Sequence, residues 1–426
     1  MNSIADRLRG IVRPATAQGV GGSKQRDGSE EQDPSQGSSQ SGRSHMDPAA
    51  ILDGEWTQAG PHRFLVVDRS YAPGHRHGSV SIADSLPPEE GWSRLGLLAG
   101  TSCGGKLLFV DLETTGIAGG AGSYAFLVGC GWFDRGRFHV RQYLLSSFAS
   151  ERALLEAVRD VTGDVDAVVT YNGKSFDLPL IETRYSLNRL TTPFADMPHV
   201  DMLHHARRLW HGDDEGHRLS SLETSLLGHE RDGDVPGFEI PARYFRYVHT
   251  GDARPLGAVL EHNRLDLLSL ALLTARAAQM LDEGVTSAAT AREALGIGRL
   301  YERAGMTSDA LACFARAADI GPGVCPDALY AHAVLLRRLR RYEAAAPAWQ
   351  RLLDLDDCPP RLEREAAEAL AVHYEHRLRS LPSARRLAMR SLLLDMTHAR
   401  REAIEHRVAR LDRKLARVEP ALPALF

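Results

Sequence analysis

Cysteine is scarce in this chain and shows no sign of pairing. Its 426 residues include five cysteines, an odd number with no CxxC spacing. That pattern argues against both a disulfide framework and a zinc site, and it fits a reducing compartment. Long apolar runs are also missing, since no segment approaches the roughly 18 residues that cross a membrane. The opening MNSIADRLRGIVRP lacks the apolar core of a secretory signal. We therefore expect a cytoplasmic protein with no membrane span.

An excess of positive charge is absent as well. The formal net charge is −4, with 25% charged and 43% hydrophobic residues. This balance argues against a generally basic nucleic-acid binder. It does not exclude a nuclease, because the acidic site of such an enzyme is filled by divalent cations. The length indicates two domains plus tails.

The first part of the chain has almost no apolar content. Residues 16–48 are mainly Gly, Ser, Gln and charged residues. They cannot bury enough surface to offset the entropy of ordering, so we expect 1–48 to be a disordered tail. Residues 49–106 regain apolar residues, and we expect them to pack on the next domain as an N-terminal extension. For His62, His75 and His77 in this extension we favour a packed loop over a His-based metal contact.

A mixed α/β pattern occupies 107–283. Apolar, β-rich runs predict strands at LLFVDLETTG, SYAFLVGCGWF, RFHVRQYLL and DAVVTYNG. The second and third flank the turn DRG, which indicates an antiparallel hairpin. Helical spacing follows at ERALLEAVRDV, FDLPLIETRYSLNRL and RLSSLETSLLG, with a stop at Gly228. A long apolar-striped helix then ends near Glu283. These elements predict a mixed sheet with flanking helices.

Residues 284–426 change character to continuous helix rich in Ala, Leu and Arg. Small, aromatic and proline residues recur there at tetratricopeptide-like offsets. The first set is Gly298, Tyr301, Ala310, Phe314, Ala317 and Pro322. A second set is Ala333, Tyr342, Ala345 and Trp349, and a weaker third is Ala371, Tyr374 and Ala384. We expect an all-α helical-repeat domain that binds a protein partner.

Three short strings supply four carboxylates and a histidine. The strings are FVDLETTG at 109–116, YNGKSFDLPLI at 171–181 and EHNRLDLLSL at 261–270. Asp111 and Glu113 leave one face of a strand, Asp177 opens a helix, and His262 lies one helical turn before Asp266. Like charges this close repel unless a cation lies between them. Oxygen donors of this kind suit two Mg²⁺ or Mn²⁺ ions, which could drive phosphodiester hydrolysis.

Each of these residues also has a purely structural interpretation. Asp177 could cap its helix through backbone amides. His262 could cap or pack, and Asp266 could pair with Arg264 or Arg276. The joint order of a DxETTG strand, an NGxxFD turn and an HxxxD helix favours the metal site.

The region 107–281 resembles the DEDD group of 3′–5′ exonucleases within the ribonuclease H-like fold. It is most similar to the YprB-type branch, in which YNGxxFD and HNxxD motifs accompany a DLETTG strand. The resemblance implies a mixed α/β sheet of ribonuclease H type, with Asp111, Glu113, Asp177 and Asp266 binding two Mg²⁺ or Mn²⁺ ions. It also implies that His262 orients or deprotonates the attacking water.

The spacing of His262 departs from the usual subtypes. Histidine-type members place the histidine five residues before the last Asp, and tyrosine-type members place a tyrosine four before it. This chain has a histidine at the tyrosine spacing, which keeps His262 and Asp266 on one helical face. A neutral imidazole is a competent base near neutral pH. The residue at the five-residue spacing, Glu261, is expected to be exposed.

The sequence also suggests where substrate binds. Thr114 and Thr115 could touch the terminal ribose or base, as the resemblance suggests, and Asn172, Lys174 and Ser175 could meet the phosphate or terminal nucleotide. For Asp201 the sequence leaves two roles open: an acid that supports the site, or a purely structural residue. The function we predict is a 3′–5′ exonuclease on single-stranded DNA or RNA ends. The alternative is an inactive nucleic-acid-binding scaffold whose repeats recruit a protein.

Overall fold

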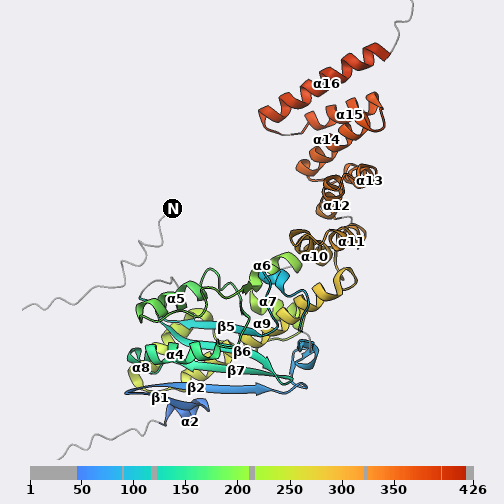
Figure 1. Cartoon of the computed structure of the whole chain (residues 1–426). Coiled ribbons are helices and arrows are strands. Elements are labelled where there is room, and N and C mark those ends of the chain that lie inside the picture. The colour runs from blue at the N-terminus through green and yellow to red at the C-terminus, as the bar shows by residue number, and fades with distance from the viewer. Residues whose placement is uncertain are drawn as a thin grey trace, which may run out of the picture. The chain divides into compact units, whose positions relative to one another are not determined.

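The computed structural model describes residues 46–88, 91–116, 122–210, 216–320, 325–394 and 396–418 (Figure 1). Most of the predicted tail 1–48 lies outside the described residues. The described residues form a seven-stranded mixed sheet flanked by helices and followed by an all-helical region. The predicted fold class is therefore confirmed.

The sheet has the strand order β1-β2-β7-β6-β5-β8-β9. These strands are β1 (Glu55–Ala59), β2 (His62–Tyr71), β5 (Leu107–Thr114), β6 (Ala125–Asp134), β7 (Arg137–Leu144), β8 (Ala167–Thr170) and β9 (His199–Asp201). Neighbours from β1 to β5 are antiparallel, and β8 and β9 add in parallel. The predicted hairpin is confirmed as β6–β7, whose two turn residues, Arg135 and Gly136, have φ values of 47° and 74°. A two-residue turn in which both φ values are positive matches the twist of the paired strands.

The extension 49–106 contributes strands to this sheet as well as packing on it. After a short helix α2 (Pro48–Leu52), β1 and β2 form a hairpin, and β2 pairs with β7. A separate small hairpin, β3 (Arg76–His77) and β4 (Val80–Ser81), follows. The boundary at 106 stays a prediction, but the first two strands belong to the sheet by hydrogen bonding.

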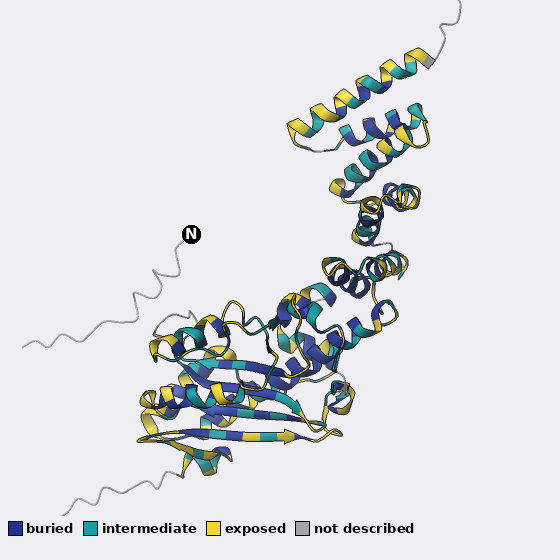
Figure 2. Ribbon diagram, in the orientation of Figure 1, coloured by how far each residue is buried: buried dark blue, intermediate teal, exposed yellow. Residues whose placement is uncertain are grey.

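Two hydrophobic cores cover the two faces of the sheet. Helix α9 (Gly257–Glu283) packs on one face, where it meets Leu107 and Phe109 of β5. Helices α4 (Glu151–Val161), α5 (Asp177–Leu187) and α8 (Ile240–Thr250) lie on the other. That second core takes the alternate β5 residues Leu108, Val110 and Leu112. The buried strands are dark blue in Figure 2. Asp111 and Glu113 continue the odd-numbered series and therefore belong to the α9 face.

Two further helical elements support the site. Helix α6 (Met202–Leu209) follows β9 directly. Helix α7 (Leu219–Leu222) continues into a π-helical turn, Glu223–Leu227, which ends at Gly228 with a left-handed φ of 66°. The predicted stop at Gly228 is confirmed, and so is the end of α9 at Glu283. The π-helical geometry was not visible in the sequence, and it carries a buried acid, Glu223.

The C-terminal region is helical as predicted. It consists of α10 (Ala291–Arg303), α11 (Thr307–Asp319), α12 (Pro326–Arg338), α13 (Tyr342–Leu353), α14 (Pro360–His376), α15 (Leu381–Leu392) and α16 (His398–Val418). Consecutive helices pack as pairs, and a Cβ at Gly298 would lie 2.6 Å from the ring of the buried Phe314. Such close contacts between small and aromatic residues are what the repeat pattern requires, but the tetratricopeptide assignment stays a prediction. Pro322 lies outside the described residues.

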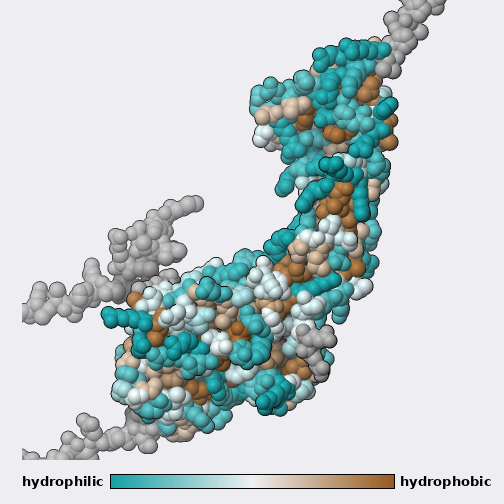
Figure 3. All heavy atoms as spheres, viewed as in Figure 1, coloured by the Kyte–Doolittle hydropathy of each residue, from teal (hydrophilic) through white to brown (hydrophobic). Residues whose placement is uncertain are grey.

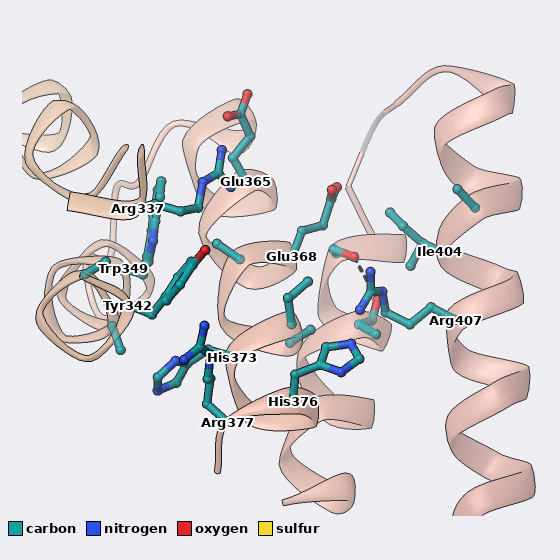
Figure 4. Close-up of a pocket in the computed structure, with 18 of the residues that line it drawn as sticks. Arg337, Tyr342, Trp349, Glu365, Glu368, His373, His376, Arg377, Ile404 and Arg407 are labelled. Atoms are coloured by element: carbon teal, nitrogen blue, oxygen red, sulfur yellow. Dashed lines mark hydrogen bonds between the residues drawn. The ribbon is translucent and has the colours of Figure 1, made fainter. Parts of the chain in front are cut away.

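A pocket of about 450 Å³ opens among helices α12 to α16. Figure 4 shows Tyr342 and Trp349 on one side of it and Arg407 on the other, with His373 and His376 of α14 between them. Its lining therefore combines aromatic faces with cationic groups.

The outer surface is mixed in character. In Figure 3 the visible face is mostly hydrophilic, with apolar atoms in small groups.

Among the described residues, none of the helices combines the length and apolar character that a membrane span requires. All five cysteines are free thiols.

Candidate active site

Asp111 and Glu113 lie at the end of the central strand β5. The parallel neighbour β8 pairs with β5 only as far as Phe109. The acidic end of β5 therefore projects beyond that neighbour, and an irregularity in the pairing with β6 follows between Glu113 and Thr114. Both carboxylates are partly buried on the face that α9 covers.

Asn263 of α9 holds Asp111 in place. Its amide nitrogen lies 2.7 Å from Oδ2 and 3.1 Å from the backbone oxygen of Asp111. Its Oδ1 accepts a hydrogen bond of 2.8 Å from Nε2 of Gln142 on β7. Gly129 faces Asp111 across the sheet, and a Cβ at that position would collide with Asn263 Oδ1. Glycine at 129 thus allows a helix side chain to reach the β5 acid.

Asp177 reaches the same strand from the start of α5. The backbone N–H groups of Asp177 itself and of Leu112 lie close enough to this carboxylate to lower its pKa, in opposition to burial. Leu112 lies between the two β5 acids, so α5 begins beside them. Phe176, and not Asp177, is the N-cap of α5, and the structure shows no side-chain cap hydrogen bond there, so the capping interpretation of Asp177 is wrong.

Asp266 pairs with an arginine that the sequence did not single out. Nη2 of Arg231 donates to Oδ1 of Asp266 at 2.5 Å, and Nε of Arg231 donates to Oε2 of Glu223 at 2.7 Å. The partners considered from the sequence make other contacts: Arg264 pairs with the exposed Glu261, and Arg276 donates to a backbone oxygen. The positive charge of the Arg231 guanidinium thus balances the negative charge of the Asp266 carboxylate.

His262 lies between two carboxylates. Its Nδ1 is 2.7 Å from Oδ1 of Asp234, and its Nε2 is 3.7 Å from Oδ2 of Asp266. The four-residue spacing thus puts His262 and Asp266 side by side on α9. Asp234 as acceptor assigns the proton to Nδ1 in the neutral ring, which leaves Nε2 as the basic nitrogen. His262 is 19% exposed at the side chain, so water can reach it.

The carboxylates interact strongly with one another. Burial, followed by the charges of Asp266 and Asp177, raises the pKa of Asp111 well above its ordinary value. Burial, followed by the charge of Asp111, does the same to the pKa of Glu113. Burial raises the pKa of Asp177 to about 7, although its backbone hydrogen bonds oppose the shift. Without cations, Asp111, Glu113 and Asp177 therefore resist ionising together.

The donor set fits Mg²⁺ or Mn²⁺. All four predicted ligand groups are carboxylates, the hard oxygen donors that these ions prefer. Their oxygens are not gathered around one point. In the described part of the chain, a group of three donor atoms within 4.8 Å of one another is formed by His77, Glu223 and His229, and not by these four acids.

The raised pKa values predict a pH-dependent response to metal. A carboxyl group whose pKa is raised in the folded state holds its proton more tightly there than in the unfolded chain. The metal-free protein should therefore lose stability as pH rises from about 4, the unfolded value, to about 7, the folded value for Asp177. Mg²⁺ binds only the ionised form, so it should raise the melting temperature by several degrees at pH 8 and by less at pH 5.5. Calorimetry with and without Mg²⁺ checks this, and an equal increase at both pH values would contradict it.

Two threonines predicted to touch substrate brace the loop after β5. The hydroxyl of Thr114 donates to the backbone oxygen of Gly116 at 2.9 Å. The hydroxyl of Thr115 accepts a 2.9 Å hydrogen bond from the backbone N–H of Tyr124. Both side chains remain partly exposed. Their substrate contacts stay a prediction, and each already has a structural partner.

The turn before α5 is held by Asp201. The carboxylate accepts hydrogen bonds from the backbone N–H groups of Asn172 at 2.8 Å and Lys174 at 3.0 Å. Asn172 adopts a left-handed φ of 65°. Asp201 is buried and supports the turn, which favours its structural interpretation. Lys174 and Ser175 are exposed, and their substrate role stays a prediction.

Sequence reasoning missed three residues at this site. Arg231 and Asp234 come from the short segment after Gly228 and reach α9 only through tertiary folding. Phe176 directly precedes Asp177, and 59% of its surface is exposed. Phe176 is part of the NGKSFD string and could have been noticed there, whereas nothing in the sequence pointed to Arg231 or Asp234.

The three histidines of the N-terminal extension lie in different environments. His62 lies at the start of β2, and His75 is exposed beside the ring of Tyr71. His77 is buried and meets Glu223 and His229 instead of the other two. His77 is packed, as the favoured interpretation expected, but it lies in β3 and its neighbours come from a distant segment.

Comparisons with known proteins agree with this architecture. A family model described as the RNase_H superfamily matches residues 108–278. The uncharacterized protein YprB of Bacillus subtilis (strain 168) is 30% identical over 384 residues, which cover 87% of this chain and 92% of that protein. The likeness thus extends well beyond the sheet and into the C-terminal helices. The chain therefore belongs to the family of the Bacillus subtilis protein YprB, and its residues 108–278 form a domain of the RNase_H superfamily.

Proposed function

We propose that this chain is a divalent-metal-dependent nuclease that acts as a 3′–5′ exonuclease on single-stranded DNA or RNA. Its ribonuclease H-like fold is of the nuclease type. The observation that supports the proposal most is the electrostatic coupling of Asp111, Glu113, Asp177 and Asp266, which come from three separate elements. A folded protein has no structural use for so costly a cluster unless cations share it.

Asp111, Glu113, Asp177 and Asp266 would hold two Mg²⁺ or Mn²⁺ ions. Such ions, when bound, supply an activated water and stabilise the departing oxygen. Asn263 keeps the Asp111 carboxylate oriented through its 2.7 Å hydrogen bond. Arg231 neutralises Asp266 until a cation binds.

His262 is the proposed general base. Asp234 holds Nδ1 at 2.7 Å and so directs the free Nε2 toward Asp266. A water placed beside Asp266 can pass its proton to Nε2 of His262 as it attacks the phosphorus atom. Asp234 is then a positioning residue, which fixes the tautomer and stabilises the imidazolium that forms.

Phe176 is the proposed stacking platform for a substrate base. It is exposed next to Asp177, and single-stranded nucleic acids bind exposed aromatic rings through their base faces. We expect Phe176→Ala to raise KM for an oligonucleotide by about 5–100-fold, the equivalent of one lost stacking contact, with kcat changed little. Leu187→Ala, at the other end of α5 and 54% exposed, is the matched control. Equal KM values for the two variants in steady-state assays would rule out the stacking role.

The proposed polarity and substrate are tested with end-labelled oligonucleotides. Single-stranded DNA and RNA, labelled at either end, are incubated with Mg²⁺ or Mn²⁺. A 3′–5′ exonuclease converts 5′-labelled substrate into a descending ladder and releases mononucleotide from 3′-labelled substrate at once. Cleavage of a circular substrate would indicate an endonuclease. Binding without any cleavage would favour the scaffold alternative.

A protein partner for the helical repeats stays an expectation. The pocket bordered by Tyr342, Trp349 and Arg407 is the place in this region where a ligand could be enclosed (Figure 4). A cytoplasmic location likewise remains part of the proposal, supported by the five free thiols.

A further inference from the structure

A cluster of metal-ligating side chains lies outside the carboxylate site. His77 of β3, Glu223 of the π-helical turn and His229 each offer one donor atom, and these atoms all lie within 4.8 Å of one another. Nε2 of His77 is 2.8 Å from Oε1 of Glu223, and Nε2 of His229 is 3.7 Å from the same oxygen. The side chains of His77 and Glu223 are 2% and 1% exposed, and that of His229 is 26% exposed.

One atom of this cluster lacks a conventional partner. In the part of the chain that the structure describes, Oε1 of Glu223 is buried and accepts no hydrogen bond of normal geometry. Nε2 of His77 also lies 2.7 Å from the hydroxyl of Ser269, which can donate to it when the nitrogen is unprotonated. The 2.8 Å contact with Nε2 of His77 satisfies this buried oxygen only when that nitrogen carries a proton, and an ion bound between the oxygen and the imidazoles would satisfy it otherwise.

The backbone holds these ligands together. Gly78 follows His77 with a left-handed φ of 64°, and a Cβ there would collide with the backbone at Leu227. Ser79 donates to the oxygen of Leu227 through its backbone N–H at 2.7 Å and through its hydroxyl at 2.8 Å. The small hairpin is thereby fastened to the end of the π-helical turn that bears Glu223. The rings of His77 and His229 stack with centroids 4.0 Å apart.

We propose that His77, Glu223 and His229 form a binding site for one Zn²⁺ ion. Two imidazole nitrogens and one carboxylate oxygen are a zinc ligand set, whereas Mg²⁺ prefers oxygen alone. Zinc bonds of about 2.0–2.2 Å in tetrahedral geometry place ligand atoms about 3.3–3.6 Å apart. The two N···O separations of 2.8 and 3.7 Å lie on either side of that range. Small side-chain movements would therefore close the site, with the Ser269 hydroxyl or a water at the fourth position.

The zinc site connects to the carboxylate site through one arginine. Glu223 faces the histidines with Oε1, and its Oε2 accepts the 2.7 Å hydrogen bond from Nε of Arg231. The same guanidinium contacts Asp266 and lies 3.1 Å from Asp234. Ser269 follows Asp266 by one turn on the same helix. Zinc would thus fix the segment that orients Arg231 and Asp234 beside α9.

The test is a zinc titration of the full-length, tag-free protein. After treatment with a chelator, the protein competes with a chromophoric chelator for Zn²⁺ in millimolar Mg²⁺. The wild type should bind one equivalent, and His229→Gln should bind it at least about 10-fold more weakly. His229 is the chosen position because its partial exposure makes correct folding of the variant the expected outcome. Binding of Co²⁺ should give visible absorption in the wild type and little in His229→Gln.

Two control variants separate this site from others. His75→Ala removes an exposed histidine two residues from His77, and Asp111→Asn disables the carboxylate site; both should bind zinc as the wild type does. Equal zinc affinity in wild type and His229→Gln would overturn the proposal, as would loss of the bound equivalent in Asp111→Asn. Because the titration uses no nucleic acid, its result is independent of whether the protein proves to be a nuclease.

Discussion

Replacing Asp111 by asparagine is expected to lower Mg²⁺-dependent cleavage of single-stranded oligonucleotides by at least about 1,000-fold, the equivalent of about 4 kcal/mol. Asparagine keeps the shape of the side chain but removes the charge that would hold the metal. After burial, the charge of Asp111 contributes most to the raised pKa of its neighbour Glu113. The measurement is the initial rate of nucleotide release at saturating Mg²⁺.

The same substitution should stabilise the metal-free protein. Removing one of several repelling, buried carboxylates relieves a cost that the fold otherwise bears, so the melting temperature at pH 8 without metal should rise by about 2–4 °C. Asp134→Asn is the matched control, because Asp134 is an exposed acid at the far end of β6. Full activity in Asp111→Asn would remove Asp111 from the site, and a large loss in the control would point to an indirect effect.

Replacing His262 by glutamine is expected to lower kcat by about 100–10,000-fold, the range for loss of a general base. Glutamine retains a hydrogen-bonding side chain of similar length but cannot accept the proton from water. Metal binding should be preserved, because His262 is not among the four proposed ligands. The measurement is kcat against pH together with the Mg²⁺-induced change in melting temperature.

Asp234→Asn distinguishes a base from a merely structural histidine. Asparagine can still accept from Nδ1 but no longer stabilises the positive charge on the ring, so kcat should fall by less than in His262→Gln. The acidic limb of the pH profile should move to lower pH than in the wild type, because the imidazolium loses its neighbouring negative charge. In His262→Ala that limb should vanish. If His262→Gln loses activity only through weaker Mg²⁺ binding, the role of general base is wrong.

Much of the fold was predictable because the local patterns are strong. The β5 strand, the β6–β7 hairpin and the long helix α9 follow from apolar runs, a DRG turn and an apolar stripe. The contribution of β1 and β2 to the sheet was less visible, since a strand near the start of the chain gives no sign of which later strand it pairs with. Register between distant strands depends on tertiary packing that short windows of sequence do not contain.

The candidate site was predictable only where motif and chemistry coincide. The four acids and His262 stand in strings whose order is informative. Arg231 and Asp234 lie in a polar loop whose charges look like ordinary solvated surface, and only folding brings them to Asp266 and His262. The proposed zinc site was hidden for the same reason. Scattered cysteines argued against zinc, and His77 is separated from Glu223 and His229 by more than a hundred residues.

The proposed two-metal site is tested most directly by anomalous X-ray scattering from crystals soaked in Mn²⁺ with a short oligonucleotide, using a variant that binds metal but lacks the base, His262→Gln. We predict two manganese peaks about 3.5–4 Å apart, enclosed by the carboxylates of Asp111, Glu113, Asp177 and Asp266. The 3′-terminal phosphodiester should lie against them. Manganese absent from these four carboxylates in crystals that contain the bound oligonucleotide would contradict the proposed site.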